Sequence, residues 1–540
     1  MEASFVTEWL GMMRRTLIVF ALLVWLPSGV VAQPIRPRAT ATTPTLIVFL
    51  TIDQFRPDYL TLFAPQFTGG LARLTSGGAV FLNGFQDHAI TETAPGHAST
   101  MSGRFPRSTG IVANAAGVND PESPLVGVRG DGASPFRFRG TVLADWLRYA
   151  DPTMRAVSVS RKDRGAILPL GRAKQDVFWF GPAGAFTTST YYADTLPDWV
   201  KRFNARQLPQ SFAGKSWTLL LDQSQYPEPD SVWYEGGGRD FLFPHLLPRD
   251  SSQAAVALAG VPMMDQVTLA LALDGLQQRA LGTSDRTDLL AVSLSSTDAV
   301  GHRYGPDSRE IHDQILRLDR YLGAFFDSLF KLRDSTRVLV ALTADHAVAP
   351  LPEAKSRYPN AGADRVELRE LWAATQASLV AAGADPKGIG FDEGILYLHP
   401  GALAVAKLKP DSVARAFARA AMRVNGVLRV DLVSELARKD TVKDYVARRW
   451  IHMLPPDVPA AAVVTLKPYW YREGVNYSTH GTPHDYDANV PIILWGARIK
   501  PGRYPNRVRV VDLAPTLAEL AGIRPMERLD GQVLRVAMRP

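Results

Sequence analysis

The sequence predicts an α/β protein, a three-layer α/β/α sandwich with a mostly parallel central sheet and inserted cap segments. Four short runs are almost wholly apolar: 46–51, 289–294, 337–343 and 490–495. Such runs are typical of strands buried on both faces, as in a parallel sheet covered by helices. Acidic residues follow the first three runs, at the strand ends where α/β folds build their sites.

The remaining elements follow from periodicity and from residues that favour turns. Residues 156–160 indicate another strand, and helical patterns cover 141–150, 254–281, 308–329 and 513–520. The helix at 308–329 repeats apolar residues on one stripe, and the last helix ends before Gly522. Two stretches are expected to be cap insertions. They are about 171–250, which lacks a steady period, and about 350–470, with a strand at 390–398 and a helix at 402–423.

Composition narrows the class of protein. The 540 residues are 46% hydrophobic and 21% charged, which is a globular profile, and the net charge of +7 suits anionic substrates. A soluble basic protein that has no anionic substrate would have the same net charge. No Lys/Arg cluster is interleaved with aromatic residues, so binding to a nucleic acid polymer is not expected. The absence of cysteine excludes disulfides, thiolate metal sites and cysteine nucleophiles.

The first 32 residues have the pattern of a secretory signal peptide. Arg14 and Arg15 precede the apolar run 17–26, and small residues at 30–32 offer a cleavage site. We expect a periplasmic protein whose mature chain begins near Gln33 and has no stable insertion in the membrane. An uncleaved anchor is the alternative. Residues 33–44, rich in Pro and Thr, are expected to be a linker before the domain at 45–540.

Thr93 is the candidate nucleophile. It stands before Ala94, Pro95 and Gly96, and proline is favoured in the first turn of a helix. A hydroxyl at the start of a helix lies beside free backbone N–H groups, which attract anions. It could attack a phosphorus atom there and have the resulting charge stabilised. A threonine that only caps the helix is the alternative.

Lys162 and Arg164 follow the strand at 156–160. In an extended chain, residues two apart point to the same face, so both cations could be aimed at one anion while Asp163 faces away. A solvated charge cluster would have the same sequence.

Six residues of metal-ligand type lie at or near the strand ends. They are Asp53, Asp298, His302, Asp345, His346 and His480. Carboxylates and neutral imidazoles suit Zn²⁺, and six ligands are enough for two ions. A pair of ions can clamp the attacking and leaving oxygens, and one of them could hold Thr93 as an alkoxide.

These motifs together resemble the alkaline phosphatase superfamily. The matching residues are Ile52-Asp53, Thr93-Ala94-Pro95-Gly96-His97, Asp298 to His302, Asp345-His346 and His480-Gly481. The threonine nucleophile is similar to that of type I phosphodiesterases/nucleotide pyrophosphatases and, most of all, of phosphate-irrepressible alkaline phosphatases. The resemblance spans residues 46–525 and supports the sandwich fold.

The resemblance implies a role for each residue. Asp53, Asp345 and His346 would bind the zinc that activates Thr93, while Asp298, His302 and His480 would bind the other. Asn114 and the backbone N–H of Ala94 would hold one phosphoryl oxygen, and Lys162 and Arg164 another. His484 is an alternative to His480, which is preferred because glycine follows it directly. His88 and His97 are expected to be structural.

The expected protein is a monomeric phosphatase that acts on small phosphate monoesters. It would contain two Zn²⁺ ions and form a covalent phosphothreonine. A phosphodiesterase or nucleotide pyrophosphatase of the same fold is the alternative, and a non-catalytic protein that binds phospho-ligands is an alternative of another class. A sulfatase is disfavoured, since its usual formylglycine precursor occurs in a different motif.

Overall fold

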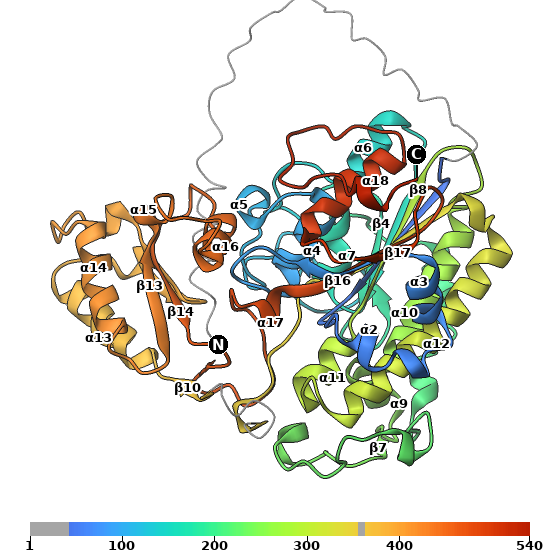
Figure 1. Cartoon of the computed structure of the whole chain (residues 1–540), viewed down its shortest axis with the longest axis horizontal. Coiled ribbons are helices and arrows are strands. Elements are labelled where there is room, and N and C mark those ends of the chain that lie inside the picture. The colour runs from blue at the N-terminus through green and yellow to red at the C-terminus, as the bar shows by residue number, and fades with distance from the viewer. Residues whose placement is uncertain (1–42, 355–361, 540) are drawn as a thin grey trace, which may run out of the picture.

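The computed structural model describes residues 43–354 and 362–539, and within them a ten-stranded sheet forms the centre of the molecule (Figure 1). The strand order is β17-β2-β16-β9-β1-β8-β3-β4-β5, and β18 also pairs with β2. The strands are β1 (Leu46–Ile52), β2 (Ala79–Phe85), β3 (Ala156–Ser160), β4 (Asp176–Phe180), β5 (Phe186–Thr187), β8 (Asp288–Leu294), β9 (Val338–Thr343), β16 (Asn489–Gly496), β17 (Gly502–Tyr504) and β18 (Val508–Arg509).

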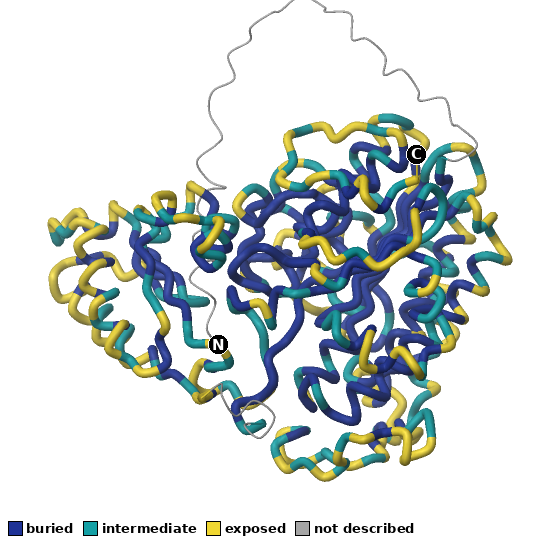
Figure 2. Tube along the Cα trace, in the orientation of Figure 1, coloured by how far each residue is buried: buried dark blue, intermediate teal, exposed yellow. Residues whose placement is uncertain are grey.

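The middle of this sheet is parallel and fully buried. β1 pairs in parallel with β8 on one side and with β9 on the other, and β3 pairs in parallel with β8. Every residue of β1 is buried, which explains why its sequence LIVFLTI contains no polar alternation (Figure 2). β16 is antiparallel to both β9 and β2. Because parallel strands end at the same edge, the residues after β1, β8 and β9 are brought together.

Helices cover both faces of the sheet, so the predicted α/β/α sandwich is confirmed. On one face α10 (Met263–Gln278) packs on β3 and β8, and α12 (Arg309–Leu332) packs on α10, α3 (Gly70–Gly77) and α11 (Ser296–Tyr304). On the other face α4 (Thr93–Ser102) contacts α7 (Asp163–Ile167) and α18 (Leu513–Leu520), and α18 contacts α6 (Leu143–Ala150).

The predicted start of the first cap, which was expected at about 171–250, lies too early in the sequence. β4 and β5 lie within that range, yet they extend the central sheet beside β3. The run Val177-Phe178-Trp179 is too short to show a period, although all three residues are buried. Beyond β5, the segment contains the helix α8 (Asp198–Asn204) and a small antiparallel sheet of β6 (Ser216–Trp217) and β7 (His245–Leu246). The helix expected over 254–281 is broken into α9 (Ser251–Ala257) and α10.

The second insertion has its own sheet and core. Its antiparallel strands run in the order β11 (Ile389–Asp392), β12 (Ile395–Leu398), β14 (Ala460–Leu466) and β13 (Val427–Leu432). The helices α13 (Arg369–Ala381) and α14 (Pro410–Ala421) pack against it and close a hydrophobic cluster (Figure 1). We call residues 362–466 the inserted domain. α15 (Val433–Leu436) and α16 (Tyr445–Met453) lie within it.

Two expected elements of the inserted domain differ in detail. The strand expected at 390–398 is a hairpin, because Glu393 and Gly394 adopt φ of +48° and +78° and turn the chain between β11 and β12. The helix expected at 402–423 begins only at Pro410, which is favoured in a first turn.

The signal peptide and nearly all of the linker lie outside the described residues. Among the described residues, no single helix has the length and apolar composition of a membrane span. One pair, Ser251–Gly260 with Met263–Gln278, passes that test together and is bent by 95°.

Candidate active site

Thr93 is the first residue of α4, as the sequence predicts. Glu92 occupies the cap position, and its side chain does not cap the helix. The helix ends at Gly103, which adopts φ of +64° in the left-handed region that glycine tolerates. Every residue of α4 is buried, so the hydroxyl of Thr93 is held on a rigid, covered helix.

Gly96 allows α4 to approach the end of β9. A Cβ added at Gly96 would lie 2.2 Å from the backbone oxygen of Asp345. Backbone cannot move away as a flexible side chain can, so α4 sits this close to Asp345 only with glycine at position 96.

We expect Gly96→Ala to lower the free energy of unfolding by about 2 kcal/mol or more, because the methyl group forces α4 away from Asp345. Chemical unfolding would measure the change. Gly260→Ala is the matched control, since a Cβ at Gly260 has no atom within 4 Å. Equal stability of the two variants would contradict this account of the contact.

Asp53, Asp345 and His346 form one cluster of possible metal ligands. Asp53 follows β1, and Asp345 follows β9, its parallel neighbour. His346 Nε2 lies 3.5 Å from Asp53 Oδ1 and 3.7 Å from Asp345 Oδ2. All three residues are fully buried.

Asp298, His302 and His480 form a second cluster. Asp298 and His302 lie one turn apart on α11, which follows β8. His302 Nε2 lies 3.1 Å from Asp298 Oδ1 and 3.3 Å from His480 Nε2, and the last atom lies 3.8 Å from Asp298 Oδ1. The rings of His346 and His480 stack with their centroids 3.5 Å apart, so the two clusters adjoin.

The three histidines present the same ring nitrogen to the site. The Nδ1 atoms of His302, His346 and His480 lie 2.5, 2.9 and 2.8 Å from the backbone oxygens of Ser478, Ala347 and Thr91, respectively. A carbonyl only accepts, so each Nδ1 donates its proton and each neutral ring keeps a lone pair on Nε2. Metal-binding histidines are held in this way by their second nitrogen.

The charge states of the first cluster also favour a cation. Among the described residues, Asp53 Oδ1, Asp345 Oδ2 and His346 Nε2 are buried and make no hydrogen bond. Burial and the charges of Asp298 and Asp345 raise the pKa of Asp53 to about 6. Burial lowers the pKa of His346 to about 4, so its ring is neutral near pH 7. Buried carboxylates with free oxygens beside a neutral imidazole fit a divalent ion.

Lys162 and Arg164 are placed differently from the extended pair that the spacing suggests. Lys162 is extended, but Arg164 belongs to α7, and Asp163 pairs with Arg164 at 3.4 Å instead of facing away. Lys162 Nζ lies 2.7 Å from both Asp53 Oδ2 and Asp298 Oδ2, and donates to Thr93 Oγ1 at 3.2 Å. Its ammonium therefore stands between the two clusters and the hydroxyl.

Asn114 also contacts the start of α4. Its Oδ1 accepts the backbone N–H of Ala94 at 2.9 Å. Asn114 and the N–H of Ala94 were expected to bind one phosphoryl oxygen together. In the structure this N–H donates to the amide oxygen of Asn114 instead. The amide NH₂ of Asn114 remains as the donor available to an anion.

His480 lies in the cluster, whereas His484 points elsewhere. His484 Nε2 lies 2.8 Å from the backbone oxygen of Leu466 in the inserted domain. Of the two histidines expected to be structural, His97 contacts the backbone oxygen of Thr93 at 2.9 Å and Asp345 Oδ2 at 3.2 Å. His88 Nε2 lies 3.2 Å from Gln86 Oε1.

Gln54 is a residue of the site that reasoning from the sequence missed. Its backbone N–H donates to Asp345 Oδ1 at 3.1 Å, and its side-chain amide donates to Asp298 Oδ1 at 3.0 Å. It therefore ties one aspartate of each cluster to the end of β1. Its φ of +64° is uncommon for a residue other than glycine. Its place in the sequence, directly after the candidate metal ligand Asp53, was the one feature that could have pointed to it.

Asp487 holds the loop that carries His480. Its Oδ2 accepts the backbone N–H and the hydroxyl of Thr482 at 3.0 and 2.6 Å. Burial raises the pKa of Asp487 from its ordinary value of 3.8 to about 8, although Thr482 and Arg449 oppose this shift.

The free energy of unfolding should therefore fall as the pH rises from about 4 to about 8, where the folded state keeps a proton that the unfolded state has lost. Asp487→Asn retains an acceptor for Thr482 and removes the ionisation. At pH 9 its melting temperature should exceed that of the parent by about 5 °C, and the difference should vanish at pH 4. Parallel melting curves across this range would contradict the assignment.

The fold and the site define an enzyme that hydrolyses phosphoric esters. The family model described as "Type I phosphodiesterase / nucleotide pyrophosphatase" matches residues 47–487. The chain belongs to this family.

The relatives of the chain include alkaline phosphatases. The alkaline phosphatase PhoK of Sphingomonas sp is 30% identical, over 92% of this chain and 91% of PhoK. The alkaline phosphatase PafA of Elizabethkingia meningoseptica is also 30% identical, over 89% of this chain and 92% of PafA. The crystal structure of wild-type PafA covers 92% of this chain and all of the PafA chain, with a TM-score of 0.83 and 29% identity. A crystallised PafA variant combines substitutions of one threonine, one asparagine, one lysine and one arginine.

Proposed function

We propose that this chain is an alkaline phosphatase of the periplasm that hydrolyses small phosphate monoesters through a covalent phosphothreonine at Thr93. One observation carries the proposal. The ammonium of Lys162 contacts the Thr93 hydroxyl and one aspartate of each carboxylate–imidazole cluster, which supports a reaction at Thr93 beside both clusters. The relatives named above as alkaline phosphatases support the activity.

We assign two Zn²⁺ ions to the two clusters, with Asp53, Asp345, His346 and Thr93 holding one ion and Asp298, His302 and His480 the other. When bound, the ions supply Lewis acidity that favours the Thr93 alkoxide and stabilises negative charge on the reacting oxygens. The Nε2 atoms that the three histidines turn toward the two clusters suit this assignment.

The protein's own residues perform the remaining work. Thr93 Oγ1 attacks phosphorus, and its P–O bond forms as the bond to the leaving oxygen breaks. The hydroxyl proton passes to solvent, and the leaving oxygen takes up a proton from solvent to depart as an alcohol. Water then attacks the phosphothreonine from the side opposite Thr93 Oγ1, which regenerates the hydroxyl and releases phosphate. Two in-line displacements give net retention of configuration at phosphorus.

Three side chains would bind the phosphoryl oxygens. The amide NH₂ of Asn114 would bind one, because its Oδ1 is occupied by Ala94. Lys162 and Arg164 would bind another with their positive charges. The dianion of a monoester carries one more charged oxygen than a diester, so these cations should matter most for monoesters. The substitutions combined in the PafA variant fall on the same four residue types as Thr93, Asn114, Lys162 and Arg164.

Lys162→Ala combined with Arg164→Ala should lower kcat/KM for an aryl phosphate monoester by roughly 10²-fold or more, because both cations stabilise the transition state. Hydrolysis of the matching methyl diester should change by less than about threefold. Lys201→Ala, at a largely exposed lysine, is the control.

A phosphodiesterase or nucleotide pyrophosphatase is the second candidate, since the family model carries that description. A parent protein that prefers the diester, with that preference unchanged in the Lys162/Arg164 double variant, would establish it in place of the monoesterase.

We further propose that the mature enzyme is a monomer without stable membrane insertion and without affinity for nucleic acid polymers. The signal pattern at 1–32 supports export. Fractionation of cells and size-exclusion chromatography of the exported protein test these points.

A further inference from the structure

The inserted domain packs against the two segments that carry Thr93 and Asn114. One face of its sheet, with Ile395, Tyr397 and Val463, joins α16 in a hydrophobic cluster. The same cluster contains Ala89 and Ile90, just before Thr93, and Val112 and Ala116, on either side of Asn114. The domain is therefore in direct contact with the start of α4 and with the loop that carries Asn114.

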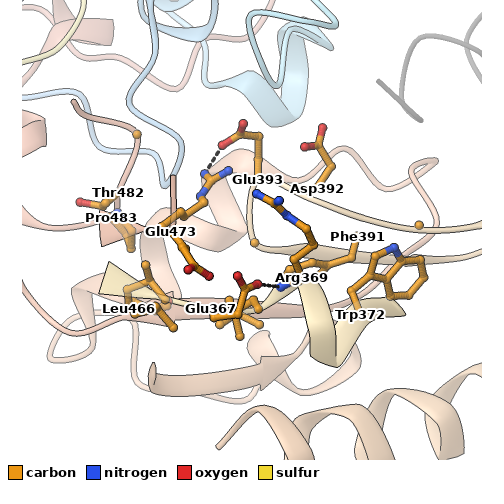
Figure 3. A pocket seen from close by; sticks show the side chains of 18 of the residues that line it. Glu367, Arg369, Trp372, Phe391, Asp392, Glu393, Leu466, Glu473, Thr482 and Pro483 are labelled. Atoms are coloured by element: carbon orange, nitrogen blue, oxygen red, sulfur yellow. Dashed lines mark hydrogen bonds and ion pairs between the residues drawn. The ribbon is translucent and has the colours of Figure 1, made fainter. Parts of the chain in front are cut away.

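A cavity of about 490 Å³ lies beside this contact. Its wall includes Glu393 and Arg472, together with Gly481 and Thr482 from the loop after His480. Figure 3 shows Glu393 and Thr482 on this wall, with a dashed line marking the ion pair of Glu393. That ion pair joins Glu393 to Arg472. Glu92 borders the same loop, because a Cβ at Gly481 would lie 3.8 Å from Glu92 Cγ.

Glu92 connects this wall to Asn114. Its Oε2 accepts the backbone N–H of Asn114 at 2.7 Å. Asn114 Oδ1 in turn accepts the N–H of Ala94, and Thr93 joins Ala94 to Glu92 in the chain. The three residues form a closed ring of bonds, so a displacement of Glu92 would move the amide of Asn114 relative to Thr93.

We propose that Glu92 is a positioning residue for the reaction. Its carboxylate fixes Asn114 so that the amide NH₂ meets the phosphoryl group, and the Glu393–Arg472 pair fixes the end of the inserted domain beside that carboxylate. Glu92 does not touch the substrate. The inference rests on the proposed function, in which Asn114 binds a phosphoryl oxygen.

A double-mutant cycle tests the proposal on the full-length, metal-loaded enzyme. Glu92→Ala should lower kcat/KM for an aryl phosphate monoester by about tenfold, as a misplaced binding group does. It should also weaken inhibition by inorganic phosphate by about the same factor. In the Asn114→Ala background the same substitution should change both quantities by less than about twofold, since no amide remains to be positioned. Glu92→Gln, which keeps an acceptor oxygen, should stay within about threefold of the parent.

The outcomes separate two kinds of failure. If Asn114→Ala leaves hydrolysis and phosphate inhibition unchanged, the role of Asn114 in the proposed function is wrong. If Asn114→Ala impairs both quantities and Glu92→Ala costs the same tenfold in either background, Glu92 acts independently of Asn114 and the inference is overturned. It is also overturned if Glu92→Ala has no effect. Glu122→Ala, at an exposed glutamate, is the control, and thermal melting verifies that each variant is folded.

Discussion

Thr93→Ala is expected to abolish turnover of phosphate monoesters, with kcat reduced by roughly 10³-fold or more. The substitution removes the hydroxyl and the γ-methyl group, and α4 tolerates alanine at its first turn. Thr93→Ser should retain part of the activity, because a serine hydroxyl can occupy the same place. Steady-state kinetics would measure both variants.

A second readout identifies the covalent intermediate. Rapid acid quenching with excess substrate should trap a phosphate on Thr93 in the parent, detectable by peptide mass spectrometry, and none in Thr93→Ala. Undiminished turnover by Thr93→Ala would remove the nucleophile assignment. A parent protein that binds phosphate esters without turnover after loading with zinc would instead point to a non-catalytic binding protein.

Removal of divalent metal is expected to reduce activity by at least roughly 10³-fold, since both the alkoxide of Thr93 and the departing oxygen then lose their counter-charge. Addition of Zn²⁺ should restore it. Elemental analysis of the restored protein should find two ions per chain.

Single substitutions should remove the metal ion of one cluster at a time. Asp345→Asn removes a ligand of the first cluster and His302→Ala one of the second, so each variant should retain about one ion per chain. Asp327→Asn is the control, because Asp327 is exposed and pairs with Arg73 at the surface. Two retained ions in both variants would show that the clusters are not the binding sites, and restoration by a different divalent ion alone would displace zinc.

The central layer of the fold could be predicted because its signal is local. In β1 and β9 nearly every residue is apolar, and each of these strands is buried on both faces. The strands β4 and β5, at one end of the sheet, could not be recognised, since strands of five and two residues show no period. The break between α9 and α10 and the hairpin at Glu393 depend on single turns inside longer apolar stretches.

Pairs of residues at the site were harder to predict than single residues. Asp298 and His302 were paired correctly because one helical turn separates them. The placement of Arg164 was wrong, because the strand ends at Ser160 and α7 begins at Asp163. The bond from Asn114 to Ala94 joins parts of the chain twenty residues apart, and no local pattern signals it.

The sequence by itself determined where the buried strands run and which side chains are the candidates for the chemistry, because apolar runs and strand-end carboxylates are local features. Only the tertiary structure decided which nitrogen each histidine presents, that Lys162 stands between two aspartates, and that Glu92 supports Asn114. Those facts depend on contacts between residues far apart in the chain, and such contacts exist only once the sheet and its insertions have packed.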